Sequence, residues 1–402
     1  MSFKKSKIAL AVAATAGLTF SSGAFATNGI IQAGNGMAAH GLGGAGLSNA
    51  NEAMSGYDNP ALISQTGDSI SMGFSVFMPD RQVDMTAVGA AAPVVSDSKV
   101  FAIPQVAFTS KINNDLSWGI MANAMGGMNT DYRTGPNGAG GAQTVDLSGM
   151  IVAPTLSYAL GKNATIGASL LIGYENLRVR NLFGSGLNNE GATVAYGVKL
   201  GADFKVVDGI SVGAVLQPKM SADEFSFFKG FLTSMGFNGD AALVLPNTAG
   251  VGAKFAAGKN MDIVADLMYY QWSGVDVFEF FGWDDQIVYK LGIEFRPSDK
   301  LALRAGINYG ESPIQGGNRT GNGGGDVAFA NYPFPAISEQ HITVGLGYKM
   351  DKNMAVNAYY LHSPEACQTA TTTSTGMGGP PAGTEICMSQ NAFGLGLNYQ
   401  SK

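Results

Sequence analysis

Apolar side chains alternate with small or polar ones along most of this chain, in segments about ten residues long. In the segment 287–295 every odd position is apolar, while the even positions include Lys290, Gly292 and Glu294. The same rhythm continues from 301 to 309, where Arg304 lies on the face opposite the apolar one. A helix would spread both sets around its circumference, whereas a strand separates them onto two faces. The alternation therefore predicts strands with one apolar face.

The composition indicates where such strands can fold. Charged residues make up only 13% of the chain, against about 25% in ordinary soluble proteins, while 46% are hydrophobic. Beyond residue 26, no apolar run reaches the roughly 20 residues that a membrane-spanning helix needs. A closed barrel is the other structure that pairs every backbone N–H and C=O group inside a bilayer. The sequence therefore predicts an all-β transmembrane protein.

About fourteen segments show the alternation, an even number as expected of a bacterial barrel. They begin near Ser69, Val100, Leu116, Leu147, Thr165, Thr193, Ile210, Asn247, Met261, Gln286, Leu301, Ile342, Met354 and Asn391. Short turns such as Asp208-Gly209 alternate strictly with long irregular connections such as 219–245. Outer-membrane barrels have short periplasmic turns and long extracellular loops, and a soluble β-sandwich has no reason to sort its connections. We therefore expect a fourteen-stranded antiparallel transmembrane β-barrel over residues 68–402, with its C-terminus in the periplasm.

Residues 1–26 have the form of a cleaved signal peptide. Three lysines precede an apolar run from 8 to 20, and Ala24-Phe25-Ala26 follows with the small residues that signal peptidase requires. The alternative, an N-terminal membrane anchor, is less favoured because the run is shorter than the roughly 20 residues of a spanning helix.

Residues 27–67 are rich in Gly and Asn and lack the alternation, so they predict no strand pair. We expect this segment to fold back into the barrel as an N-terminal hatch that plugs the lumen. Residues 41–46 match the pattern G-x-G-x-x-G, but no strand precedes them and no βαβ unit surrounds them, which argues against dinucleotide binding. These glycines suit close packing of the hatch against the barrel wall.

One of the long loops carries a cluster of apolar side chains. The cluster consists of Phe225, Phe227, Phe228, Phe231, Leu232, Met235 and Phe237. The spacing of positions 225, 228, 232 and 235 is that of one face of a short helix. An apolar patch facing water predicts capture of a hydrophobic ligand, and a flexible Met suits varied ligand shapes. The alternative is a loop that packs on itself or dips into lipopolysaccharide.

The sequence argues against several other types of site, each for a specific reason. The net charge of −6 argues against a nucleic-acid partner. Cys367 and Cys387 lie in an exported, loop-like stretch, so we expect a disulfide there; a metal site is not expected because no His lies nearby. The three histidines show no spacing with a nucleophile that would indicate a hydrolase, so no enzyme activity and no cofactor are expected.

A set of short motifs gives the chain a family resemblance. Asn59-Pro60-Ala61 stands just before the first predicted strand and closes the Gly-rich stretch. Further motifs follow in order at 266–272 (DLMYYQW), 304–306 (RAG) and 335–341 (PAISEQH). On these motifs the chain resembles the FadL family of outer-membrane transporters for long-chain fatty acids and other hydrophobic compounds. The resemblance covers essentially all of the chain beyond the signal peptide.

The resemblance implies a hatch that ends with Asn59, Pro60 and Ala61, an extracellular capture site, and a sideways exit where the third strand is kinked. Carried to this chain, the kink falls at Ala124, Gly126 and Gly127, after a third strand predicted over 118–124. Glycine can interrupt a β-ladder locally, although an ordinary strand end would explain these residues equally well.

The family's barrels usually finish on an aromatic residue. Here Tyr399 stands three residues before Lys402, the last residue, and we take it as the equivalent.

The alternation rule also places charged side chains in the lumen. They are Lys199, Asp203, Asp262, Asp266, Lys290, Glu294 and Arg304. Most are expected to pair with one another. A fatty acid would need one cation for its head group, and Arg304, with its fork of donors, is the first candidate, with Lys290 as a second.

The expected function is passive uptake of hydrophobic molecules, with long-chain fatty acids or related hydrocarbons as the expected cargo, by a monomer in the outer membrane. The ligand would bind at the loops, enter a pocket partly lined by Ile30 and Ile31, and leave sideways through the wall. Outer-membrane lipid and lipopolysaccharide are the other expected partners. The alternatives are a general porin for polar solutes, which would conduct ions, and a surface adhesin, which would not need the hatch.

Overall fold

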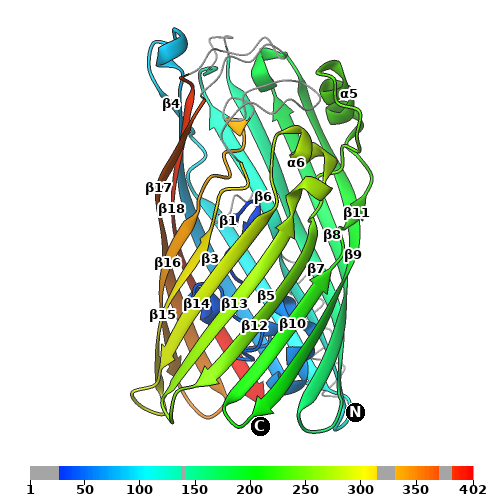
Figure 1. Cartoon of the computed structure of the whole chain (residues 1–402), viewed down its shortest axis with the longest axis vertical. Helices are drawn as coiled ribbons and strands as arrows, with labels where there is room; N and C mark the ends of the chain where they lie inside the picture. Colours follow the sequence, from blue (N-terminus) through cyan, green and yellow to red (C-terminus); the bar gives the residue numbers. More distant parts are fainter. Residues whose placement is uncertain (1–26, 137–140, 315–330, 371–382, 402) are drawn as a thin grey trace.

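The computed structural model describes residues 27–136, 141–314, 331–370 and 383–401. In these residues, fourteen long antiparallel strands form one closed barrel (Figure 1). The strands are β3 (Asp68–Asp84), β5 (Phe101–Lys111), β6 (Leu116–Tyr132), β7 (Gln143–Ala159), β8 (Ala164–Arg180), β9 (Asn188–Val207), β10 (Ile210–Gln217), β12 (Asn247–Ala256), β13 (Met261–Gln271), β14 (Gln286–Phe295), β15 (Leu301–Gly310), β16 (Gln340–Lys349), β17 (Met354–Thr369) and β18 (Glu385–Ser401). The predicted fold class and strand number are confirmed.

Neighbouring strands in the sequence pair with each other, and the barrel closes where its last strand meets its first. β18 pairs with β3 along the whole length of β3, from Ser401 opposite Asp68 to Glu385 opposite Asp84. No helix among the described residues is long and apolar enough to span a bilayer.

The connections sort onto the two ends of the barrel. Turns of two to five residues join β5 to β6, β7 to β8, β9 to β10, β12 to β13, β14 to β15 and β16 to β17 at one end, the short-turn end. The C-terminus lies at this end, and the remaining connections lie at the other, the long-loop end (Figure 1). Several strands run further toward the long-loop end than the alternation predicted. β3 continues past Pro79 to Asp84, and β6 continues to Tyr132.

The outer surface of the barrel is apolar, with aromatic residues at two levels. Tyr269, Tyr289 and Tyr309 are exposed near the long-loop ends of their strands. Exposed aromatic residues near the short-turn end include Phe295 and Tyr399. Two such belts mark the interfaces of a bilayer with a barrel. Tyr399 therefore occupies a belt position within β18, although it is not the last residue.

Smaller elements lie at the long-loop end of the barrel. They are β4 (Val94–Val95), β11 (Ser221–Ala222), α5 (Ser226–Ser234), α6 (Asp276–Phe280) and the single 3-10 turns η2 (Thr86–Val88), η3 (Leu182–Gly184) and η4 (Trp272–Gly274). The helix α5 confirms the helical spacing that the sequence showed in this loop.

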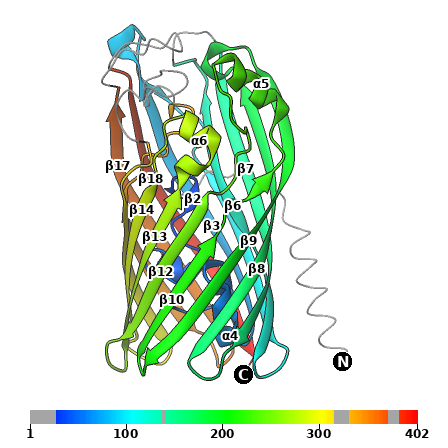
Figure 2. The same ribbon diagram turned by 45° about the vertical axis from the view of Figure 1, so that its right-hand side comes forward.

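Residues 27–67 lie inside the barrel and are called the hatch (Figure 2). The hatch consists of a hairpin of β1 (Thr27–Asn28) and β2 (Ile31–Gln32), followed by the short turns of helix α2 (Met37–His40), α3 (Ser55–Asp58), η1 (Pro60–Leu62) and α4 (Ile63–Thr66). Its apolar side chains, including Ile30, Leu42 and Leu62, are fully buried. The hatch thus fills the lumen as a plug.

Candidate functional site

Backbone groups of the hatch are held by charged side chains of the wall. The carboxylate of Asp266 on β13 accepts hydrogen bonds from the N–H groups of Gly46, at 2.7 Å, and Leu47, at 3.2 Å. On the neighbouring strand, the Lys290 ammonium donates to the carbonyl of Ala33 at 2.8 Å. Lys199 on β9 donates in the same way to the carbonyl of Tyr57 at 2.9 Å. The lumenal charges therefore attach the hatch to three separate strands.

The Asn59-Pro60-Ala61 motif is a structural joint between hatch and wall. The Asn59 side-chain oxygen accepts from the N–H of Ala61 and so caps η1, while Pro60 takes the first helical position. The Asn59 amide nitrogen donates to the carbonyls of Leu47, at 2.7 Å, and Ala202 of β9, at 3.0 Å. One side chain thus orders the end of the hatch and fixes it to the barrel.

Glycines allow hatch and wall to approach closely, as the sequence indicated. A Cβ atom added to Gly41 would lie 2.9 Å from the Cα of Gly345 on β16. A Cβ added to Gly306 on β15 would lie 2.2 Å from the carbonyl carbon of Leu42. Backbones this close leave no space for water beside these residues.

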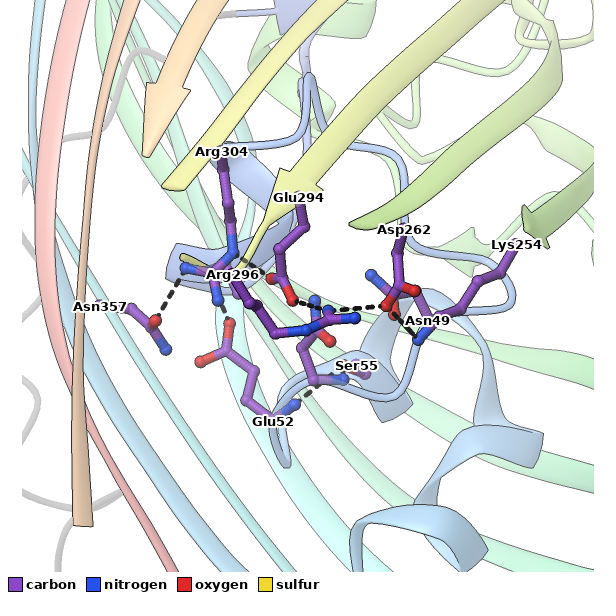
Figure 3. Close-up of polar contacts among 11 residues, drawn as sticks. Asn49, Glu52, Ser55, Lys254, Asp262, Glu294, Arg296, Arg304 and Asn357 are labelled. Carbon is purple, nitrogen blue, oxygen red and sulfur yellow. Dashed lines mark hydrogen bonds and ion pairs between the residues drawn. The ribbon is translucent and has the colours of Figure 1, made fainter. Parts of the chain in front are cut away.

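Arg304 lies in an ion network near the short-turn end (Figure 3). Its Nε donates to Glu294 at 2.7 Å, and its Nη1 donates to Asn357 at 2.9 Å. Arg296 then joins Glu294, at 2.6 Å, to Asp262, at 2.8 Å. A cavity of about 330 Å³ adjoins this network and opens at the short-turn end. The guanidinium of Arg304 is therefore already engaged by protein groups.

A second, smaller cavity lies between the hatch and the wall. Its volume is about 60 Å³. The lining residues are Ile31, Gln32, Asn35, Gly44, Leu47, Tyr57, Asp58, Ala124, Met125, Lys199, Val215, Gln217, Leu245, Thr248, Asp266, Met268, Tyr270 and Lys290. Three of the predicted site residues, Ile31, Lys290 and the kink residue Ala124, thus meet here, whereas Arg304 does not line it. Lys199 and the acidic Asp58 line the same cavity. Ligand pockets commonly measure about 300–1,000 Å³, so this cavity must widen to admit a ligand.

The third barrel strand, β6, carries a β-bulge at the predicted kink. Its pairing with β7 shifts register between Ala124 and Gly126. Gly126 has a φ of 150°, which L side chains rarely adopt, and a Cβ there would lie 2.4 Å from the carbonyl oxygen of Ile30. The N–H of Gly127 donates to that same carbonyl at 3.3 Å. The strand itself continues to Tyr132, so the predicted strand end at 124 was placed too early.

The hatch hairpin also bonds to the bulge through its side chains. The Gln32 amide donates to the carbonyl of Ala124 at 3.4 Å and to Asn123 at 3.3 Å. Asn123 in turn donates to the side chain of Asn35. The hairpin turn, β2 and the segment that follows β2 therefore all contribute contacts to the interrupted ladder.

The apolar side chains of the α5 loop are folded inward rather than exposed to water. Phe225, Phe228 and Leu232 are 4%, 3% and 0% exposed. Phe227, Phe231 and Met235 are half-buried against the same cluster. The premise that this patch faces solvent is therefore wrong, because the loop packs its helix onto the top of the barrel.

The α5 loop is held in place by an ion pair outside the membrane. Lys229 donates to Glu224 at 2.9 Å and also bonds to the carbonyl of Gly239. The N–H of Ala241 donates to Glu224 at 3.2 Å. The Lys229 hydrogen bond, followed by that of Ala241, holds the pKa of Glu224 below its ordinary value.

A second aromatic group, around Trp272, joins the apolar cluster of the α5 loop. Its residues were not among the predicted site residues. Trp272 stacks edge-on against Trp283 and Phe278, with ring centroids 5.3 Å apart in both pairs. A Cβ added to Gly29, at the turn of the hatch hairpin, would lie 2.4 Å from the Trp272 ring. In the sequence, the signal that could have revealed this group is the run of aromatic residues between 272 and 283.

Two further buried charged residues were also missed. Arg81 on β3 is 2% exposed, and Glu175 on β8 is 0% exposed. The alternation of β8 would have placed Glu175 inward, whereas Arg81 lies beyond Pro79, in the part of β3 that the alternation did not predict.

Cys367 and Cys387 form a disulfide between directly paired residues of β17 and β18. The bridge therefore joins two strands where they extend toward the long-loop end. It does not lie within an irregular loop.

A family model described as "Outer membrane protein transport protein (OMPP1/FadL/TodX)" matches residues 12–238 and 191–402 of the chain. No curated protein matches the chain.

Solved structures share the barrel at low sequence identity. The toluene transporter TodX of P. putida is 17% identical, with a TM-score of 0.69, covering 92% of this chain and 99% of that one. A FadL homologue of Pseudomonas aeruginosa is 14% identical, with a TM-score of 0.67 and coverages of 93% and 100%. The toluene transporter TbuX of Ralstonia pickettii is 15% identical, with a TM-score of 0.63 and coverages of 92% and 99%. At these identities the likeness shows the fold.

The fourteen-stranded barrel and the family match together locate the protein in the bacterial outer membrane. Because the two matched segments span nearly the whole sequence, this chain belongs to the outer membrane protein transport family, OMPP1/FadL/TodX.

Proposed function

We propose that the protein takes up hydrophobic molecules by passive transport, with long-chain fatty acids or related hydrocarbons as cargo. The family membership and two similar structures, both of toluene transporters, support a hydrophobic cargo. No energy source is needed, because such molecules move down their own concentration gradient into lipid.

The observation that carries the proposal is one continuous buried apolar cluster. It includes Phe228 of α5 and Trp272 at the long-loop end, Ile30 and Leu47 of the hatch, and Met125 at the bulge. An apolar molecule can exchange contacts along this cluster without meeting water. Methionine at its lower end can adapt to different cargo shapes.

The route has three steps. Cargo binds among the half-buried aromatic side chains beside α5, such as Phe227 and Phe231. It then enters the cavity beside Ile31, which widens as the hatch shifts. Finally it leaves sideways at the bulge around Gly126, where the wall ladder is interrupted.

For a fatty acid, we place the carboxylate at Lys290 and Lys199 rather than at Arg304. Both lysines line the cavity, whereas Arg304 is engaged by Glu294 and Asn357 near the short-turn end. Lys199 donates to one hatch carbonyl and Lys290 donates to two, those of Ala33 and Gly44, so each ammonium group has at least one further proton for a carboxylate.

The test is uptake of radiolabelled oleate and toluene by cells that express the protein as their sole barrel of this family. Replacing Ala124 by Trp fills the cavity and should lower both uptake rates at least about tenfold, since overpacked sites reject a further occupant. The matched control is Ala265→Trp, because Ala265 is exposed on the outer face of β13. Equal uptake by the Ala124 variant and the wild type would refute the route.

A further inference from the structure

Glu175 is a buried carboxyl group with no partner. It lies on β8, is 0% exposed, and neither of its carboxylate oxygens has a hydrogen-bond partner. No ion pair within the described residues includes it. A buried polar group without a hydrogen-bond partner destabilises the fold. Its presence therefore indicates another state of the molecule in which the carboxyl group has a partner.

Small residues flank Glu175 on several sides on the inner face of the wall, and the larger Leu177 follows it on the same face of β8. It is paired with Gly149 of β7 on one side and with Thr193 of β9 on the other. Gly173 precedes it by two residues on the same face of β8, and Ala195 lies diagonally across on β9. Apart from the threonine hydroxyl, this surface offers little that could satisfy a carboxyl group, but it leaves space in front of it.

Flexible and aromatic side chains fill that space. A Cβ added to Gly149 would lie 3.3 Å from Cβ of Met125, and one added to Gly173 would lie 3.5 Å from its sulfur. From the loop side, Phe227 covers Gly191, where a Cβ would lie 3.1 Å from its ring. Met125 also lines the cavity of about 60 Å³. A rotation of this one unbranched side chain would therefore open the cavity toward Glu175.

The position coincides with the bulge. Gly149, the partner of Glu175, is itself paired with Gly126 on the other side. The carboxyl group thus lies one strand away from the interrupted ladder, at the same level of the wall.

We propose that Glu175 recognises apolar molecules that carry a hydrogen-bond donor, that is, long-chain alcohols or amines, as they pass Met125 toward the bulge. The cargo O–H or N–H group donates to the carboxyl oxygens, and its alkyl chain occupies the apolar cluster. This inference rests on the proposed function and adds a polar specificity that an apolar route alone would lack.

The test compares 1-decanol and decylamine with decane, which lacks the donor. Initial uptake rates are measured at subsaturating concentration in cells that express the wild type, Glu175→Leu, Glu175→Gln or Glu190→Gln. Glu190 lies on the neighbouring strand and pairs with Arg178, so it serves as the matched control. Folding of each variant is checked by its heat-dependent mobility in gels and by its thermal unfolding in detergent.

The Leu variant should take up 1-decanol and decylamine about tenfold more slowly than the wild type, because one hydrogen bond to the carboxyl group is lost. Its decane uptake should be unchanged and its melting temperature higher, since the unpaired carboxyl group is gone. The Gln variant should retain the alcohol and lose the amine, whereas the Glu190 variant should match the wild type.

Two results would overturn the inference in distinguishable ways. If Glu175→Leu is more stable but keeps the wild-type ratio of 1-decanol to decane uptake, Glu175 has no part in recognition while the proposed function stands. If the wild type takes up none of the three probes faster than cells without the protein, the proposed function fails, and the inference fails with it.

Discussion

At the scale of single residues, the choice of cargo can separate the carboxylate-binding role that we propose for Lys290 from its contact with the hatch. Its ammonium group bonds to the hatch carbonyl of Ala33 and also lines the cavity. A Lys290→Met variant should lower oleate uptake about tenfold, because a charge-assisted hydrogen bond to the carboxylate is lost, and should leave toluene uptake near the wild-type rate.

The control is Lys254→Met, since Lys254 pairs with Asp262 at 3.1 Å and does not line that cavity. A parallel loss of oleate and toluene uptake in the Lys290 variant would mean that the lysine only holds the hatch.

Individual residues also differ in how far the sequence could predict them. Lys290 and Glu294 follow from the alternation alone, because a charged side chain on one face of a lipid-spanning strand must point inward. The engagement of Arg304 by Asn357 could not be predicted, because it joins two strands far apart in the sequence. The alternation along β8 predicts that Glu175 points inward, but its lack of a hydrogen-bond partner is a property of the packed structure.

At the scale of elements, the α5 loop depends on the Lys229–Glu224 pair for its position. Because the folded state lowers the pKa of Glu224, the pair contributes stability above the pKa of an unfolded glutamate, about 4.3, and loses it as the pH falls through the lower folded value. Glu224→Gln should therefore speed amide hydrogen exchange in 226–234 at pH 7.

The wild type should show the same faster exchange, after correction for the intrinsic pH effect, once Glu224 is protonated. Asp208→Asn is the control, because Asp208 pairs with Lys205 at the opposite end of the barrel. Exchange in 226–234 that is the same for wild type and Glu224→Gln would show that apolar packing alone positions α5.

Strand ends were the least predictable feature of the elements. The outward positions of β8 become polar at Asn176 and Arg178, beyond Tyr174, although the ladder with β9 continues to Arg180. Above the bilayer both faces of a strand meet polar surroundings or loops, so the alternation no longer marks the strand. The α5 side chains were misjudged for a related reason, since a loop sequence does not reveal what it packs against.

At the scale of the whole molecule, we expect the hatch to keep the barrel from conducting ions. Asn59→Ala removes two hydrogen bonds to Leu47 and Ala202 together with the cap of η1, which should weaken hatch attachment by roughly 2–4 kcal/mol. In planar bilayers we expect almost no ion current through the wild type, brief openings for the Asn59 variant, and a steady open channel after deletion of 27–58.

Ser64→Ala is a suitable control, since the Ser64 hydroxyl donates to the carbonyl of Ala61, which is also part of the hatch. A steady current through the wild type would contradict the plug and favour a general porin. Strand number, closure and a plugged lumen could all be predicted, because the bilayer allows few alternatives.

The bulge and the hairpin together act as an interlock. The carbonyl of Ile30 and the amide of Gln32 satisfy backbone groups of β6 at the gap, and they belong to the same hairpin that blocks the way down from the loops. On the proposed route, a molecule that pushes this hairpin aside from above would therefore unseal the side of the cylinder in the same movement. Entry and exit would then be coupled, so cargo would find its exit only by completing its entry.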